Sequence, residues 1–239
     1  MAGIYSGSLI LVNAEHPLRD GRRPPLAPAA PGSSVLLETR ASAMLTGALE
    51  RLGAVGEIVP VSGWRSRAEQ QQIWDDSMAE NGEDFTRKYV AIPGCSEHQT
   101  GLAIDLALRS DSIDFIRPDF PYDGVCGRFR EIAPDYGFIE RYPAGKEKIT
   151  GIAAEPWHFR YVGRPHARLM RDMGLTLEEY VELLHGYPYP GRLLSAAGGG
   201  YDAFVGFSRS YTPQEHRAPC QVSGNNVDGY ILTLWRLPA

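Results

Sequence analysis

Residues 95–105 have the sequence CSEHQTGLAID, and residues 155–158 have the sequence EPWH. Together they supply two imidazoles, from His98 and His158, the carboxylate of Asp105, and a second carboxylate in the EPWH stretch. Zn²⁺ binds imidazole nitrogen and carboxylate oxygen, and a catalytic zinc keeps one position open for water. A nearby carboxylate can take the proton of that water. The two stretches therefore contain the parts of a catalytic zinc site.

The first stretch predicts a turn followed by a buried strand. Residues 102–108, LAIDLAL, are apolar and few, which is typical of a buried strand. His98 lies seven residues before Asp105, and Gly101 between them permits a bend. A buried aspartate needs a partner, and a metal ion is one of the few that suffices. An arginine is the alternative partner for Asp105.

The second stretch predicts another strand. Pro156 disfavours a helix in the residue before it. Aromatic residues alternate with His158 and Arg160 from Trp157 onward, which is strand periodicity. His158 and Arg160 are therefore expected on one face of a sheet. Glu155 comes just before this strand, within reach of a water held at the metal.

Each residue alone has a plainer interpretation, since a single histidine beside a strand is usually structural. The joint occurrence of two histidines, Asp105 and Glu155 favours a metal site. Cys95, three residues before His98, is a candidate fourth ligand. A fourth protein ligand would close the catalytic position, so a small buried filler is the preferred interpretation of Cys95.

The segments SEHQTGLAIDL (96–106) and EPWHFRYVG (155–163) resemble the SxHxxGxAxD and ExWHxRYVG signatures of the zinc-dependent D-Ala-D-Ala carboxypeptidases of the VanY type. The similarity is greatest to the VanXY branch, which combines dipeptidase and carboxypeptidase activity. Residues 62–66, SGWRS, resemble the family's SGYRS segment, with Trp64 in place of tyrosine. The resemblance covers about residues 8–186, beginning with an opening strand at residues 9–13.

The resemblance implies a role for each of seven residues. The zinc ligands would be His98, Asp105 and His158, and the general base would be Glu155. Arg65 would stabilise the oxyanion. Ser96 and Gln70 would hold the C-terminal residue of the substrate. A guanidinium stays charged and presents several fixed donors, so the chemistry permits the role of Arg65. The alternatives are a surface salt bridge for Arg65 and a plain turn residue for Ser96.

Composition limits the class of protein. The chain has 239 residues, 43% hydrophobic and 22% charged, which is enough for one good core. A net charge of −5 argues against nucleic acid as a partner. No apolar run approaches the length of about 20 residues of a membrane span, and no signal peptide is apparent at the first residues. Three cysteines, an odd and sparse set, favour a reducing compartment, so we expect a cytoplasmic protein.

We expect an α+β fold with a single catalytic domain over residues 1–190, in which a central antiparallel sheet carries the zinc ligands and helices flank it. Residues 191–239 are expected to form a linker and a short β-rich extension, packed on this domain or on another copy in a homo-oligomer. The further expected elements are helices at 40–52, 66–80, 129–136, 165–173 and 177–185, strands at 57–61 and 230–235, a loop or lid at 109–128 and a Gly/Ala-rich linker at 195–200.

The leading functional hypothesis is a zinc metallopeptidase that hydrolyses D-Ala-D-Ala ends, of the free dipeptide, of cell-wall precursors or muropeptides, or of both. Its role would be peptidoglycan precursor metabolism, either glycopeptide resistance or recycling. One alternative is a related L,D- or endo-peptidase of peptidoglycan. Differences in the loop at residues 109–128 would decide between this activity and a D,D-peptidase. Another is a non-catalytic zinc-dependent module that binds peptidoglycan fragments, but such a module has no need of Glu155.

Overall fold

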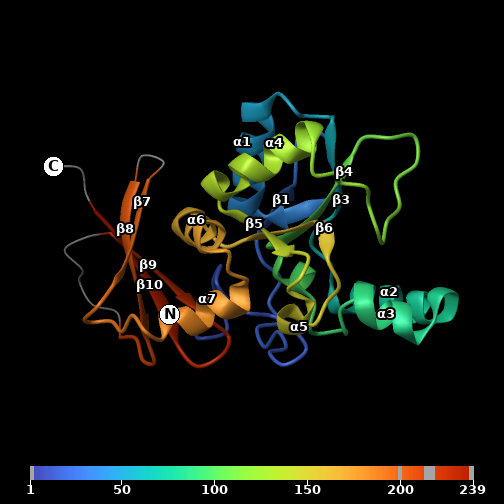
Figure 1. Ribbon diagram of the computed structural model, residues 1–239. Helices are drawn as coiled ribbons and strands as arrows, with labels where there is room; N and C mark the ends of the chain where they lie inside the picture. Colours follow the sequence, from blue (N-terminus) through green and yellow to red (C-terminus); the bar gives the residue numbers. More distant parts are fainter. Residues whose placement is uncertain (1–2, 199–200, 213–218, 237–239) are drawn as a thin grey trace.

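The computed structural model describes residues 3–198, 201–212 and 219–236, and it has the expected α+β architecture (Figure 1). The central sheet is antiparallel, with the strand order β3 (Ile58–Ser62), β4 (Ala103–Leu108), β6 (Glu155–Tyr161) and β5 (Phe138–Tyr142). No helix in the described ranges is both long enough and apolar enough to cross a membrane.

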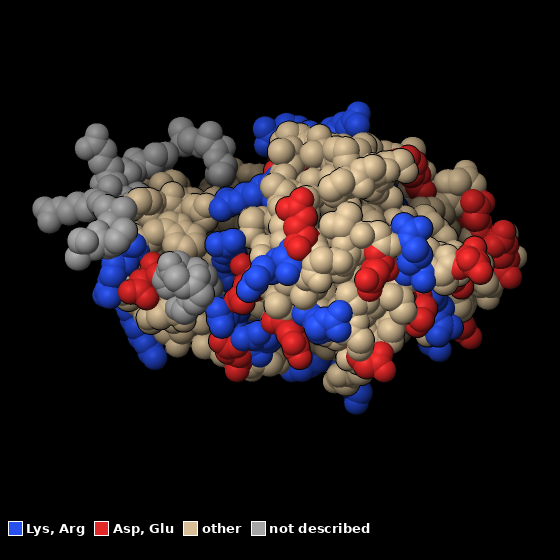
Figure 2. Space-filling model, turned by 90° about the horizontal axis from the view of Figure 1, so that it is seen from above, with Lys and Arg blue, Asp and Glu red and all other residues tan. Residues whose placement is uncertain are grey.

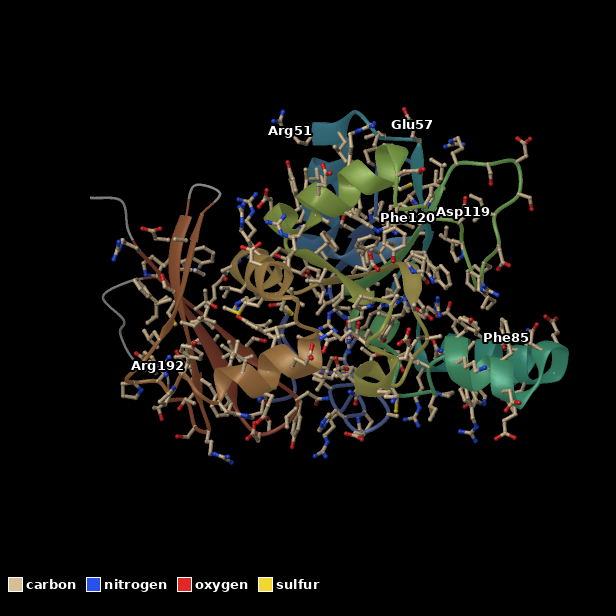
Figure 3. All side chains as sticks on the ribbon, in the orientation of Figure 1. Arg51, Glu57, Phe85, Asp119, Phe120 and Arg192 are labelled. Carbon is tan, nitrogen blue, oxygen red and sulfur yellow. The ribbon has the colours of Figure 1, made fainter. Side chains whose placement is uncertain are left out.

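One face of this sheet is covered by α1 (Thr39–Leu52) and α4 (Gly124–Ile132) (Figure 1). The apolar positions of α1 recur at helical spacing and enter the main core, and Gly53 ends the helix in the left-handed conformation. Phe120 packs edge-to-face on aromatic side chains of α4 and β6, and it lies between the helix and the sheet (Figure 3). This apolar face leaves the opposite face of the sheet for polar side chains.

The remaining elements of the catalytic region are mostly short. Ser66 and Glu69 form the expected capping box at the start of α2. The elements are β1 (Leu26–Pro28), β2 (Leu36–Glu38), α2 (Arg67–Asn81), α3 (Glu83–Tyr89), η1 (Glu97–Thr100), η2 (Ala133–Tyr136) and α5 (Glu147–Thr150).

A second, four-stranded antiparallel sheet ends the chain, in the order β7 (Leu194–Gly198), β8 (Tyr201–Ser208), β10 (Tyr230–Trp235), β9 (Cys220–Gly224). The helices α6 (Arg164–Met173) and α7 (Leu177–Leu184) lie between it and the central sheet (Figure 1). A second core joins these parts, including Leu9, Leu11, Met170, Tyr180, Val205 and Ile231. The C-terminal sheet therefore packs on the rest of its own chain.

Three expectations are wrong in detail. Residues 195–198 belong to strand β7 rather than to a linker, and residues 199–200 lie outside the described part. The lid loop ends at residue 123, because α4 already begins at Gly124. The predicted opening strand at residues 9–13 has no strand pairing; instead Leu11 donates its backbone N–H to the Asn225 carbonyl in the C-terminal region.

Candidate metal centre and active site

The pairing of β4 with β6 places Asp105 directly opposite His158. His98 comes from the short turn η1, which ends at Gly101 with φ 74°. A Cβ at Gly101 would lie 3.1 Å from the Glu38 backbone nitrogen, so glycine fits both the backbone conformation and the crowding there. The predicted turn and strand are thus confirmed, and they bring the three expected ligands together.

Asp105 is at the centre of this cluster. Its Oδ2 lies 3.2 Å from His98 Nε2, and its Oδ1 lies 3.0 Å from His158 Nδ1. All three side chains are buried, and one ligand atom from each lies within 4.8 Å of the others. Within the ranges that the structure describes, no other three such side chains converge in this way, and Cys95 is not part of the cluster.

The contacts suit a cation at this cluster. Asp105 Oδ1 is buried and has no hydrogen-bond partner in the described structure, although His158 Nδ1 is close. His98 Nδ1 lies 2.7 Å from the Gly63 carbonyl oxygen, which can only accept. The proton of His98 is therefore on Nδ1, and its Nε2 lone pair faces Asp105. Two imidazole nitrogens and one carboxylate oxygen form a donor set that fits Zn²⁺.

The pKa values of the two histidines differ in direction. Burial lowers the pKa of His98 to about 4, with a contribution from the positive charge of Arg65. Burial also opposes charge on His158, but Asp105 and Glu97 outweigh it and raise its pKa to about 9. The negative field that favours a proton on His158 equally favours a cation beside Asp105.

Glu155 is the first residue of β6, and its Oε2 lies 3.5 Å from His158 Nδ1. The side chain is buried beside the cluster. Burial raises the pKa of Glu155 to about 8, with the Asp105 carboxylate adding to the rise and His158 and Arg65 opposing it. A carboxylate whose pKa is near the working pH can both accept and return a proton.

Arg65 is held on three sides. It donates from Nε to Ser62 Oγ at 2.7 Å, from Nη1 to Gln70 Oε1 at 3.2 Å and from Nη2 to Asp105 Oδ2 at 3.1 Å. The amide nitrogen of Gln70 donates to the Ala91 carbonyl at 2.9 Å, so both polar atoms of this buried side chain bind the protein. Gln70 thus orients Arg65. Ser96 is also buried and lines the same cavity.

The cavity at the cluster has a volume of about 40 Å³. Its walls include Phe115 and Ile116 from the loop at residues 109–123, together with Tyr142 and Trp157. The cavity is therefore narrow beside the metal-ligand candidates. A larger cavity of about 930 Å³ lies between the catalytic region and the C-terminal sheet, but it contains none of the metal-ligand candidates. The small cavity is therefore the candidate site.

Four residues at or behind this site were not singled out from the sequence as site residues: Glu97, Arg141, Tyr142 and Arg160. Alternation along β6 places Arg160 on the same face of the sheet as His158, so strand periodicity could have identified Arg160 as a residue near the site. Glu97 precedes His98 directly, but nothing in its neighbours along the chain indicates what it meets in space.

On the face shown in Figure 2, acidic and basic side chains are interspersed, without a broad basic surface.

Comparison with known proteins places the chain among peptidases. Residues 38–164 match the family model VanY, described as D-alanyl-D-alanine carboxypeptidase. Over 180 residues the chain is 42% identical to the bifunctional D-Ala-D-Ala dipeptidase and D-Ala-D-Ala carboxypeptidase VanXYC of Enterococcus gallinarum, covering 74% of this chain and 95% of that protein.

Two solved structures are similar as well. The vancomycin resistance D,D-dipeptidase VanXYg, in complex with a D-Ala-D-Ala phosphinate analogue, matches with a TM-score of 0.93 and 47% identity over 98% of this chain and 95% of that one. The vancomycin resistance D,D-pentapeptidase VanY from a VanB-type cassette, a mutant form in complex with Zn(II), matches with a TM-score of 0.62 and 34% identity over 73% and 98%. The first match includes the C-terminal sheet, so the resemblance extends beyond the predicted limit at residue 186.

Proposed function

The chain belongs to the VanY family of D-alanyl-D-alanine carboxypeptidases, and we propose that it is a zinc peptidase in which His98, Asp105 and His158 hold the metal. It hydrolyses the D-Ala-D-Ala peptide bond, as carboxypeptidase, dipeptidase or both. The observation that carries the zinc assignment is the convergence of three buried ligand atoms within 4.8 Å, with Glu155 beside them. The direct test is D-alanine release from D-Ala-D-Ala and from a D-Ala-D-Ala-ended peptide, with and without a chelator.

Two side chains of the site have complementary roles in this proposal. Polarisation of the scissile carbonyl and acidification of water are the chemistry that zinc supplies when bound. The Glu155 carboxylate accepts the proton of the attacking water and then gives it to the leaving amine of the terminal D-alanine. The guanidinium of Arg65 faces the same cavity and stabilises the negative charge that develops on the carbonyl oxygen.

The substrate we propose is a peptide that ends in D-Ala-D-Ala, including the free dipeptide and soluble cell-wall precursors. The walls of the small cavity include Phe115, Tyr142 and Trp157, beside the metal-ligand candidates. We propose that Ser96 and Gln70, both buried in the wall of this cavity, hold the terminal residue of the substrate, and that Gln70 also orients Arg65. All three cysteines are free thiols, which supports a cytoplasmic location, where such precursors are made.

Arg65→Lys is expected to lower kcat/KM by about 10²–10³-fold, which is the effect of losing one oxyanion donor in other enzymes. The lysine ammonium is a point charge, whereas the planar guanidinium of Arg65 donates to Ser62, Gln70 and Asp105 from three different nitrogens. Lysine therefore cannot replace it. Steady-state kinetics and zinc content measured on the same preparation check this prediction, with the exposed Arg171 changed to lysine as control. Equal losses of rate and zinc would assign Arg65 to metal retention rather than to the reaction.

We propose that the extension at residues 191–239 is a structural part of the enzyme. Ile231→Ala should lower the free energy of unfolding by about 2–5 kcal/mol, because Ile231 is 1% exposed in the second core. Turnover per folded molecule should remain near the wild-type value, since every proposed site residue lies outside this sheet. Urea unfolding measures the stability change, and Ile149→Ala, at a 42% exposed position, is the control. A strong loss of kcat in fully folded Ile231→Ala would show instead that the extension shapes the site.

A further inference from the structure

Glu97 is a buried acid that lies behind the metal site and has no part in the proposed reaction. Its side chain is 0% exposed. Its Oε1 lies 2.8 Å from Arg141 Nε and 2.8 Å from Arg160 Nη1, and both of these arginine side chains are also 0% exposed. One oxygen of Glu97 therefore faces two guanidinium groups, while the other is left for a different partner.

The second oxygen faces His158. Glu97 Oε2 and His158 Nε2 are 3.7 Å apart, and both atoms are buried without a hydrogen-bond partner in the described part of the chain. Unpartnered buried polar atoms are costly, and each of these two is the natural complement of the other. On the opposite side of the imidazole ring, Nδ1 faces Asp105 and Glu155.

We propose that Glu97 is a positioning residue that accepts a hydrogen bond from the Nε2–H of His158. The proton is thereby held on Nε2, and Nδ1 keeps its lone pair for the metal. The inference rests on the zinc site of the proposed function. A metal-bound histidine needs its other ring nitrogen protonated, and a carboxylate beyond the ring fixes both that tautomer and the ring orientation. Glu97 is the only described carboxylate whose oxygen lies near His158 Nε2.

Glu97 is itself held in place from two directions. Arg141 binds the Glu178 carboxylate of α7 through Nη1 at 2.9 Å and Nη2 at 2.6 Å. Arg160 Nη2 donates to the carbonyl oxygens of Ser8 and Ile10 at 3.1 and 2.9 Å. Helix α7 and the N-terminal segment thus fix the two arginines, and the arginines fix Glu97 against His158.

Glu97→Gln tests this role with little change of shape. The guanidinium groups of Arg141 and Arg160 donate only to an acceptor, so they bind the amide oxygen of the new glutamine. Its NH₂ group is then turned toward His158 Nε2. An NH₂ donates there and favours the wrong tautomer, with the proton on Nδ1. We expect zinc affinity, measured by competition with a chromophoric chelator, to fall about 10–100-fold. The matched control is Glu182→Gln on the same helix α7, an exposed carboxylate that contacts His185 outside this buried network, and it should keep zinc affinity within about threefold of wild type.

The tautomer of His158 is a second readout that does not depend on the variant folding. In zinc-loaded wild type, ¹⁵N NMR of the imidazole should show the proton on Nε2 and the metal on Nδ1. A proton on Nδ1, or full zinc affinity in Glu97→Gln, would overturn the inference and leave the proposed function intact. A wild-type chain that takes up no zinc at all would overturn the proposed function, and this inference with it.

Discussion

Replacement of Glu155 by glutamine is expected to lower kcat by about 10²–10⁴-fold while zinc content stays at the wild-type level. The amide has nearly the same shape, but it cannot take the proton of water. Glu155 is not one of the three converging ligands, so the metal should remain. Burial raises the pKa of the Glu155 carboxyl to about 8 in the absence of metal, and a cation held by the three ligands would lower it toward the ionised form that a base requires.

The control for this variant is Glu140→Gln. Glu140 lies on the neighbouring strand β5, where its carboxylate binds Tyr122 and Arg130 and does not line the small cavity. It should keep near-normal turnover, and any effect should be on stability. Glu155→Gln with normal kcat would place the general base elsewhere. Loss of zinc from Glu155→Gln would mean that Glu155 helps to retain the metal.

Removal of the metal is expected to have a still larger effect, namely a fall of D-alanine release to the uncatalysed background. The chain has no other described group of three ligands that could hold a replacement ion, so the loss should be complete. Added zinc should restore the rate in proportion to the zinc bound. The chelated protein should remain folded, because two large apolar cores do not depend on the ligand side chains. Circular dichroism before and after chelation checks that point.

The strands that carry the site could be predicted because their patterns are local. Residues 102–108 are apolar throughout except for Asp105, and the alternation after Pro156 is strand-like, so both strands and the facing of His158 follow from short stretches. The capping boxes at Ser66 and Thr176 likewise depend on residues three positions apart. In such segments local preference and tertiary packing agree.

The parts that were mispredicted depend on distant residues. Residues 195–198 have the composition of a linker, yet pairing with β8 makes them a strand, because tertiary context overrides weak strand propensity. The helix α4 begins earlier than expected, since Val125 and Cys126 are buried against the main core. Glu97 meets Arg141, Arg160 and His158 only after folding, so its contacts could not be inferred from spacing.

The central claim is that this chain is a zinc-dependent D,D-peptidase, and one measurement tests it most directly. Purified protein is incubated with D-Ala-D-Ala, with a peptide ending in D-Ala-D-Ala, and with a matched peptide whose terminal D-alanine follows an L-residue. D-Alanine release is measured with chelator and after zinc is restored. The account predicts release from one or both D,D-substrates that the chelator abolishes and zinc restores. Release that persists without metal, or release from the L,D-peptide alone, would contradict it.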